Sequence, residues 1–413
     1  MTGSQWILWG SALSPFFLKT RSMLDYYGWT YRVLPDEGGL LENLSYALRW
    51  WSIRSGSSAV THPRLTELDE LPLVPYLLGP DSINLYDSSA IGEWLDHNQH
   101  RKPTAGPIPG NIQVIAGESP EIAPLLPDED PAIRFVIRLI DEYFDEFGLY
   151  MAHHNRWKVS AGDNRAGERL AHEMRNVVFF LRPIIARRFS ARQVRRMPYL
   201  FSIAPPGFQL PDLPPELQPP AHYDFPPTHA LLENCFEQLL KALEPIFQKQ
   251  RFLLGDRFTL ADAALYGQLG MNLSDPEAAS WIQQWAPRLY SWLLRIERAD
   301  FSEHNNTGRL QLHKGLVPLL KEICRIYPPL MVANEKAYMR YRLEGVIVFN
   351  EPAYRKNQAL FDTQLGGQYI RSVVKTFQVK TWRSLQTEWV RMQSASKKKL
   401  LRILPRRHGL DPD

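Results

Sequence analysis

The chain has 413 residues, of which 44% are hydrophobic and 22% are charged, and its formal net charge is +4. This length and composition predict a globular protein of two or more domains and argue against a disordered chain. No apolar run reaches the length of a membrane span, and the first residues lack the pattern of a secretory signal. The two cysteines, Cys235 and Cys324, are too few for a disulfide framework or a cysteine-rich zinc site, and they favour a reducing, cytoplasmic location.

The first hundred residues alternate between strand and helix patterns. Gly28 is placed to end the first helix, and Gly79-Pro80-Asp81 marks a hairpin turn between the last two strands. The predicted elements are a strand at 6–12, a helix at 15–27, a strand at 30–35, a loop with a short helix at 36–70, strands at 71–78 and 82–87, and a helix at 88–98. This order predicts a small α/β domain.

Residues 101–131 are rich in proline and glycine and predict an interdomain linker. Beyond them the apolar residues recur at helical spacing, and Thr259 with Asp262 forms a capping box at a helix start. Amphipathic helices are expected at 132–154, 167–189, 228–248 and 281–297, with a proline-dense surface loop or partner site at 204–227. The second part of the chain is therefore predicted to be all-helical.

The segment that follows Arg371 is rich in lysine and arginine. A basic segment of this kind is more often a solvated helix end, although it could also contact phosphate or an acidic membrane surface. We therefore expect no nucleic-acid partner, and membrane contact through this tail is the weaker alternative.

Four short stretches carry a resemblance to a known family. They are SPF at 14–16, LVPYLL at 73–78, YDSSAI at 86–91 and LLGDRFTLADAALY at 253–266. In this order and at these distances they resemble the cytosolic glutathione transferases, and the chain beyond residue 300 is similar to that of longer bacterial members. The resemblance implies a thioredoxin-like, glutathione-binding domain at 1–100, a linker at 101–130, a helical substrate domain at 131–300 and a C-terminal extension at 301–413.

Within this resemblance, Ser14 matches the residue that contacts the sulfur of glutathione. A thiol with a pKa near 8.5 is mostly protonated at neutral pH, so a hydroxyl that donates a hydrogen bond to the thiolate would activate it. Serine cannot form mixed disulfides, and the chain has no Cys-x-x-Cys motif, so disulfide exchange is not expected. The alternative is that Ser14 only caps the helix that begins at Pro15, and both roles are compatible.

The resemblance assigns the rest of the glutathione site to two further stretches. Val74 and Pro75, joined by a cis bond in the family, would pair with the cysteinyl unit of glutathione. Ser88 would bind the γ-glutamyl carboxylate at a helix start, and Asp87 would lie near its ammonium group. Either residue could instead only cap that helix.

The partner of the glycyl carboxylate is left open, because the stretch 36–70 departs from the family pattern. Arg49, Arg54 and Arg64 are the candidates, and the sequence does not choose among them.

The second substrate is expected between the domains, against the first long helix of the helical domain. His153, His154, Arg156 and Trp157 stand near the end of that helix and could bind an anionic aromatic compound or assist proton transfer. A polar helix end is the competing interpretation. A metal site is not expected, because adjacent histidines diverge on a helix and no third ligand is apparent.

Together these features predict a homodimeric glutathione transferase that attacks a hydrophobic electrophile, with glutathione as co-substrate. The alternative is a non-catalytic binding or scaffolding protein that has kept the fold.

Overall fold

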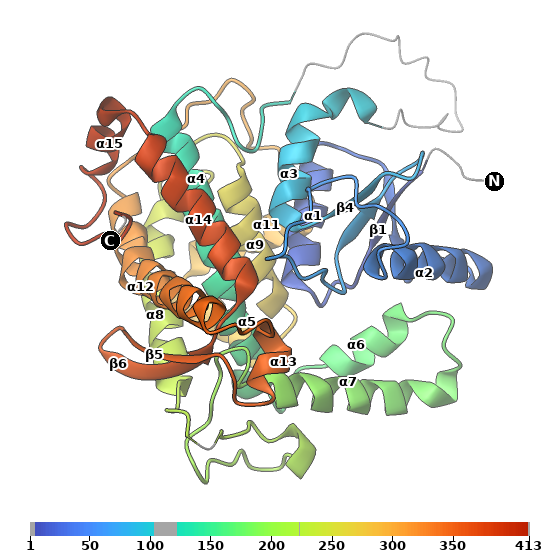
Figure 1. Ribbon diagram of the computed structural model, residues 1–413. Helices are drawn as coiled ribbons and strands as arrows, with labels where there is room; N and C mark the ends of the chain where they lie inside the picture. The colour runs from blue at the N-terminus through green and yellow to red at the C-terminus, as the bar shows by residue number, and fades with distance from the viewer. Residues whose placement is uncertain (1–4, 103–121, 223, 412–413) are drawn as a thin grey trace, which may run out of the picture.

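The computed structural model describes residues 5–102, 122–222 and 224–411. Most of the predicted linker at 101–130 therefore lies outside the described residues. The chain begins with a small sheet flanked by helices, continues into a helical region, and ends in further helices and a hairpin that pack back onto both (Figure 1).

The N-terminal sheet has the strand order β2-β1-β3-β4. Strands β1 and β2 are parallel, and β3 runs antiparallel to both β1 and β4. The elements of this domain are β1 Trp6–Trp9, α1 Pro15–Tyr26, β2 Tyr31–Leu34, α2 Leu40–Arg54, β3 Tyr76–Leu78, β4 Asn84–Tyr86, α3 Ser88–His97 and the turn η1 Gln99–Arg101. This is the predicted thioredoxin-like arrangement, and the fold class is confirmed.

Alternation along the strands gives the sheet two buried faces. Trp6 and Leu8 point toward α1 and α3 and join the main core, whereas Ile7 and Tyr76 pack with Ile53 of α2 in a separate cluster. The predicted short helix within 36–70 is thus a 15-residue helix that packs on the second face of the sheet through Ile53.

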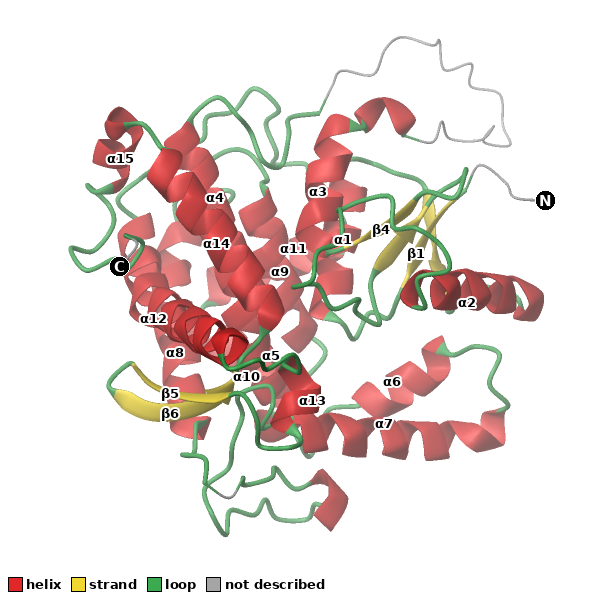
Figure 2. Cartoon of the chain, in the orientation of Figure 1, coloured by secondary structure: helices red, strands yellow, loops and turns green. Residues whose placement is uncertain are grey.

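The part of the chain after the N-terminal sheet is mostly helical (Figure 2). It is built around one long column in which α-helix alternates with π-helical turns. The column consists of α4 Pro131–Tyr143, η2 Phe144–Gly148, α5 Leu149–His154 and η3 Asn155–Val159. It is followed by α6 Ala166–Glu173, η4 Phe179–Leu181, α7 Arg182–Arg196, η5 Pro215–Leu217, α8 His229–Phe247, α9 Leu260–Asn272, α10 Pro276–Trp285 and α11 Pro287–Glu297.

Two segments that were each predicted to be one helix are each divided into two helices. The helix expected at 167–189 is divided into α6 and α7, and the one expected at 281–297 is divided by Pro287. In both cases a proline stands in the first turn of the second helix, at Pro183 and Pro287. Proline fits there because it needs no N–H partner. Its ring disfavours helical backbone in the residue before it, which accounts for the break at Ala286, where φ is −143° and ψ is 65°. Arg182, before Pro183, is helical, and the first break lies earlier, after Glu173.

The two domains meet where α1 packs closely against α9. A Cβ atom added to Gly267 of α9 would lie 2.7 Å from the Pro15 carbonyl oxygen and 2.8 Å from Lys19 Cβ. Only glycine allows this approach, which fixes the start of α1 against the helical domain.

The C-terminal extension contributes α12 Leu316–Leu343, α13 Asn350–Tyr354, the antiparallel hairpin of β5 Leu360–Leu365 and β6 Gln368–Val373, α14 Thr376–Arg391 and α15 Ser394–Leu400. Helices α12 and α14 bury apolar side chains in the same core as the helical domain, including Tyr327 and Trp382, whose rings meet edge to face. The extension is therefore an integral layer of the molecule.

The expected solvated basic tail is found at Arg391, Lys398, Arg402, Arg406 and Arg407, which are exposed, but not at Lys375, which is buried. Lys380 pairs with Asp69 at 2.6 Å, and Lys399 pairs with Asp130 at 2.9 Å. These contacts bind the extension to residues that lie about 270 to 310 positions earlier in the chain. Among the described helices, none is long and apolar enough to cross a membrane.

Candidate functional site

The sheet topology brings the predicted glutathione-site residues to one edge. Trp9, Tyr76 and Tyr86 form one row across β1, β3 and β4. Because β1 and β4 both end at this row and β3 begins at it, the segments 10–14, 74–75 and 87–88 all emerge from the same edge of the sheet.

At this edge Ser14 is the N-cap of α1. Its hydroxyl oxygen accepts a hydrogen bond from the Phe17 N–H at 3.4 Å, and Pro15 occupies the first helical turn. The Ser14 side chain is half-buried. The predicted cap is therefore confirmed, and the hydroxyl proton is not used by this contact.

The other two segments lie beside this cap. The Val74–Pro75 peptide bond is cis and leads directly into β3. Asp87 has a left-handed backbone with φ of 68° and caps α3, where its carboxylate accepts hydrogen bonds from Ser89 N–H at 3.1 Å and Ala90 N–H at 3.3 Å. Ser88 is buried at the first helical position.

Lys19 ties this edge to the helical domain through a buried ionic network. Its ammonium group donates to Asp141 at 2.5 Å, to Asp145 at 2.6 Å and to Ser89 Oγ at 2.7 Å. Burial alone would lower the pKa of Lys19, but the two carboxylates raise it above its ordinary value. Burial raises the pKa of the nearby Asp87 carboxyl, and Lys19 opposes that shift.

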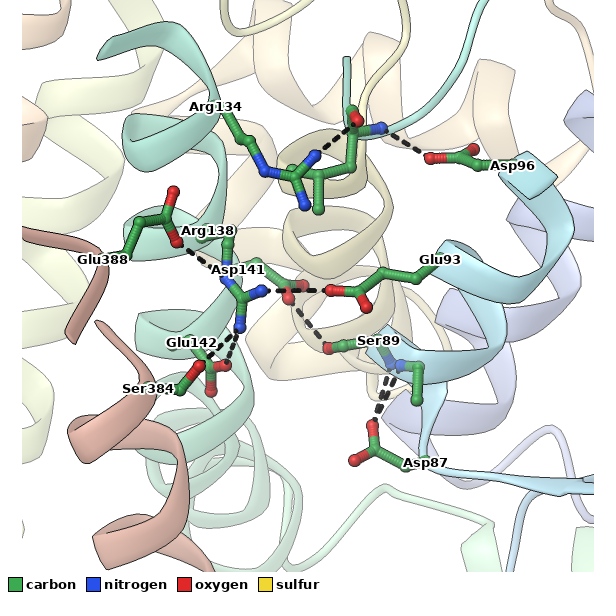
Figure 3. A network of polar contacts seen from close by, with 12 residues as sticks. Asp87, Ser89, Glu93, Asp96, Arg134, Arg138, Asp141, Glu142, Ser384 and Glu388 are labelled. Atoms are coloured by element: carbon green, nitrogen blue, oxygen red, sulfur yellow. Dashed lines mark hydrogen bonds and ion pairs between the residues drawn. The ribbon is translucent and has the colours of Figure 1, made fainter. Parts of the chain in front are cut away.

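Figure 3 shows how this contact continues along α4. Ser89 of α3 donates to Asp141, and one turn earlier on α4 Arg138 pairs with Glu93 of α3 at 3.1 Å and with Glu388 of α14 at 3.5 Å. The N-terminal domain, the helical column and the extension are thus held together by one row of polar contacts.

A cavity of about 880 Å³ opens between these three parts of the molecule. Phe16 of α1 and Leu73 border it next to the predicted glutathione residues, and Glu146 and Tyr150 of the long column form the facing wall. The extension contributes Asn350, Glu351, Pro352, Arg355, Lys375, Phe377 and Gln378. The cavity thus lies against the first long helix, and binding of the second substrate in it stays a prediction.

The π-helical turn η2 helps to shape this wall. Inserting an extra residue per turn rotates the following side chains, and such turns are frequent at functional sites. Glu146 belongs to η2, and burial together with Asp145 raises the pKa of its carboxyl to about 8.

The four residues predicted for the substrate wall lie elsewhere in the column. Within the described residues, none of His153, His154, Arg156 and Trp157 lines this cavity. Arg156 is buried, its Nε donates to both carboxylate oxygens of Asp275 at 2.9 and 3.0 Å, and its Nη1 donates to the Leu13 carbonyl oxygen at 2.9 Å. Arg156 therefore fixes the backbone of Leu13, the residue before Ser14, from inside the helical domain.

The two histidines and the tryptophan are also internal. His154 is fully buried between Ser202 and Glu233, and burial lowers its pKa. Burial lowers the pKa of His153 to about 3, and its ring lies against Trp157. The geometry of all four residues corresponds to the alternative interpretation, a structural helix end.

The three arginine candidates for the glycyl carboxylate have separate positions. Arg49 donates to Asn84 and to the carbonyl oxygens of Gly79 and Ile83 at the far end of β3 and β4. Arg64 is exposed. Arg54 borders the cavity, where it donates to the carbonyl oxygens of Leu71 and Pro72.

The sequence did not predict that residues of the C-terminal extension line the cavity. The basic composition after Arg371 marked Lys375 only as part of a charged segment, and nothing local indicated that it faces Tyr150. In the described residues no cluster of three His, Cys, Asp or Glu side chains is placed to hold a metal ion.

Comparison with known proteins identifies one part of the chain directly. Residues 213–300 match the family model described as glutathione S-transferase, C-terminal domain. This region is therefore similar to a glutathione S-transferase C-terminal domain. It contains α8 to α11, including the α9 helix that packs on α1. No curated protein matches the chain.

Solved glutathione S-transferases are similar to the chain at low identity. Rice GST1 in complex with glutathione is 16% identical, covers 73% of this chain and 92% of its own, and has a TM-score of 0.35. A Rhodospirillum rubrum glutathione S-transferase is 14% identical, with coverages of 75% and 97% and a TM-score of 0.35. The β-etherase LigF from Sphingobium sp. is 17% identical, with coverages of 73% and 98% and a TM-score of 0.39.

Proposed function

We propose that the protein is a glutathione transferase in which Ser14 stabilises the glutathione thiolate for attack on an electrophile in the interdomain cavity. The observation that supports this most is the convergence of three segments at one sheet edge. The Ser14 cap, the cis Val74–Pro75 bond and the start of α3 all lie there, beside the cavity that Phe16 and Leu73 border.

A hydrogen bond from Ser14 and the N-terminus of α1 together provide enough free energy to lower the pKa of the glutathione thiol to the required value. A thiol pKa near 8.5 must fall by about 2 units for the thiolate to predominate at neutral pH, which corresponds to about 2.7 kcal/mol. One hydrogen bond to a charged acceptor contributes about 1.5–3 kcal/mol, and a helix N-terminus contributes about 0.3–2 kcal/mol. Ser14 at the start of α1 would supply both.

In the proposed reaction the thiolate sulfur forms a bond to an electrophilic carbon. In a substitution the leaving group departs with the electron pair of the bond that breaks, and in an addition the carbon that gains the pair takes a proton from water. Asp87 and Ser88, at the start of α3, would bind the γ-glutamyl end. Arg54 is the candidate for the glycyl carboxylate that lies nearest to the cavity.

Titration calorimetry with reduced glutathione tests the site, and the ultraviolet absorbance of the bound thiolate tests its chemistry. Ser14→Asp keeps an acceptor for the Phe17 N–H but has no proton to donate at neutral pH, whereas Ser14→Thr keeps both functions. We expect Ser14→Thr to retain the lowered thiol pKa and Ser14→Asp to lose it while the helix stays capped. An equally low thiol pKa in both variants would limit Ser14 to capping.

The second candidate is a non-catalytic protein with the same fold. It is favoured by the stretch 36–70, where Arg49 and Arg54 already donate to backbone carbonyl oxygens. Absence of glutathione binding at millimolar concentration, in the wild type and in Ser88→Ala alike, would decide for this candidate.

Homodimerisation and a cytoplasmic location remain expectations from the resemblance. Sedimentation of the full chain measures the first directly. Helix α14 covers part of α4 at Arg138, so any dimer must form without that surface.

A further inference from the structure

The extension places a buried cation at the end of the interdomain cavity. Lys375 lies between β6 and α14, is 8% exposed, and lines the cavity together with Gln378. Its ammonium group donates to the Tyr150 hydroxyl and lies 4.2 Å from the centre of the Tyr150 ring and 4.8 Å from that of Tyr199. Within the described residues Lys375 forms no ion pair with a carboxylate.

The backbone that carries this lysine is held rigidly. Asn334 donates to the Lys375 carbonyl oxygen at 2.9 Å and accepts from its N–H at 2.9 Å. Asn350 donates to the Thr376 hydroxyl at 2.9 Å and accepts from the Thr376 N–H at 2.9 Å. Since all four residues are buried, the position of the ammonium group is set before any ligand arrives.

The surroundings of Lys375 contain an acidic group, a basic group and a helix start. Burial lowers the pKa of Lys375 to about 7, Glu146 opposes this shift and Arg196 adds to it. The first turn of α14 faces the cavity through Phe377 and Gln378. A helix N-terminus carries a partial positive charge, which favours an anion. Gln378 donates to the Tyr150 hydroxyl at 2.8 Å, so that hydroxyl is oriented by two donors.

The carboxylic groups nearby do not supply the missing counter-charge. The Glu146 carboxyl, with its pKa raised to about 8 by burial and by Asp145, is largely protonated at neutral pH. Glu351 is occupied by Arg196 at 3.0 Å and by Arg355 at 2.6 Å. A buried amino group that has no ion-pair partner, faces a cavity and becomes fully charged when an anion binds is typical of a binding site rather than of a structural ion pair.

We infer that the cavity takes electrophiles that carry a carboxylate, and that this carboxylate binds Lys375 at the start of α14 while the reactive carbon lies toward Ser14. The inference rests on the proposed function and adds the substrate class and the part played by the extension. A single carboxylate matches the one ammonium group of Lys375 in charge.

The test compares two electrophiles that differ in one charge, a chlorodinitrobenzoate and its methyl ester. In both, the glutathione sulfur bonds to the ring carbon, and chloride leaves with the electron pair of the carbon–chlorine bond. We expect kcat/KM to favour the carboxylate by about tenfold, since a hydrogen bond to a charged group contributes about 1.5–3 kcal/mol. Lys375→Met should abolish this preference, and Lys375→Gln should reduce it.

Lys398→Met provides the matched control, because it removes the same charge from an exposed position of the same extension. It should leave the preference unchanged. Equal rates for both electrophiles, or a preference that survives in Lys375→Met, would overturn the inference.

A binding measurement separates this outcome from failure of the proposed function. The two S-aryl glutathione conjugates, acid and ester, are titrated into the full chain by calorimetry. Binding of both with equal affinity overturns the carboxylate site alone. Binding of neither overturns the glutathione site and the inference with it, whereas tighter binding of the acid that Lys375→Met removes supports both.

Discussion

Two buried lysines of this protein have opposite surroundings. Lys19 in α1 is 1% exposed and touches two carboxylates, which hold its pKa above the ordinary value. Lys375 before α14 is 8% exposed and touches a tyrosine hydroxyl and two aromatic rings, and burial lowers its pKa to about 7. The side chain and the degree of burial are nearly the same, so the difference lies in the partners.

This difference separates a structural charge from a ligand-binding one. Lys19 completes a network between α1, α3 and α4, and nothing further is needed to neutralise it. Lys375 is held in place by backbone contacts while its charge is left without a partner, at a cost in stability. A cost of this kind is expected where an anionic substrate supplies the partner.

The largest effect is expected for Lys19→Met. It leaves Asp141 and Asp145 buried without their cation, and breaking a buried ion pair costs about 3–5 kcal/mol. Urea denaturation at pH 7 should show this loss in the free energy of unfolding. The double variant Lys19→Met with Asp141→Asn should recover part of it, since one of the two stranded charges is then absent. A change below about 1 kcal/mol in the single variant would mean that the network is not the main tie between the domains.

Lys375→Met is expected to change stability in the opposite direction. The folded-state pKa is lowered from 10.5 to about 7, so between these values the unfolded chain binds more protons than the folded chain. The free energy of unfolding of the wild type therefore rises with pH through this window, by at most about 1.4 kcal/mol per pH unit. Lys375→Met removes this slope and should stabilise the protein most at pH 7 and below.

The groups that face the Lys375 ammonium come from four elements or their flanks: Glu146 of η2, Tyr150 of α5, Arg196 and Tyr199 at the end of α7, and Gln378 of α14. Glu146 titrates near the same pH, so Glu146→Gln is measured in parallel to isolate the lysine. The raised folded-state pKa of Glu146 makes the free energy of unfolding fall, not rise, with pH up to about 8, so a rise between pH 7 and 10.5 that persists in Lys375→Met would show that a group other than Lys375 and Glu146 is its source.

The sequence predicted the N-terminal domain better than the site. Strand and helix patterns are local, and so is the cap at Ser14, because each depends on residues within one turn or one strand. The resemblance placed Val74, Pro75, Asp87 and Ser88, and the sheet topology brings them to one edge. Their contacts with glutathione remain predictions.

The substrate wall could not be predicted in the same way. His153, His154, Arg156 and Trp157 carry suitable chemistry, but the π-helical turns of the column change which side chains face the cavity, and the wall is instead formed one to two turns earlier by Glu146 and Tyr150. Lys375 meets Tyr150 across 225 positions of sequence. Periodicity describes neighbours in a helix and contains nothing about a contact of that range.

The smallest change in stability is expected for Lys380→Met. Lys380 pairs with a carboxylate, as Lys19 does, but it is more exposed than Lys19 and Lys375. Lys380 is in α14, one and a half turns beyond Lys375, and pairs with the buried carboxylate of Asp69. Burial raises the pKa of Asp69, but hydrogen bonds from Lys380, Thr66 and Tyr86 lower it overall. Because two of these donors remain in the variant, the expected loss in the free energy of unfolding at pH 7 is only about 1 kcal/mol.

The lowered folded-state pKa of Asp69 means that its contribution to stability is present above pH 3.8 and is lost as the pH falls through the folded value. The cost of Lys380→Met should therefore shrink in acid. The carboxylate preference of the cavity should be unaffected, since Lys380 does not line it within the described residues. Loss of that preference in Lys380→Met would show that the extension acts by holding the loop around Asp69, and that the charge of Lys375 is not what selects the substrate.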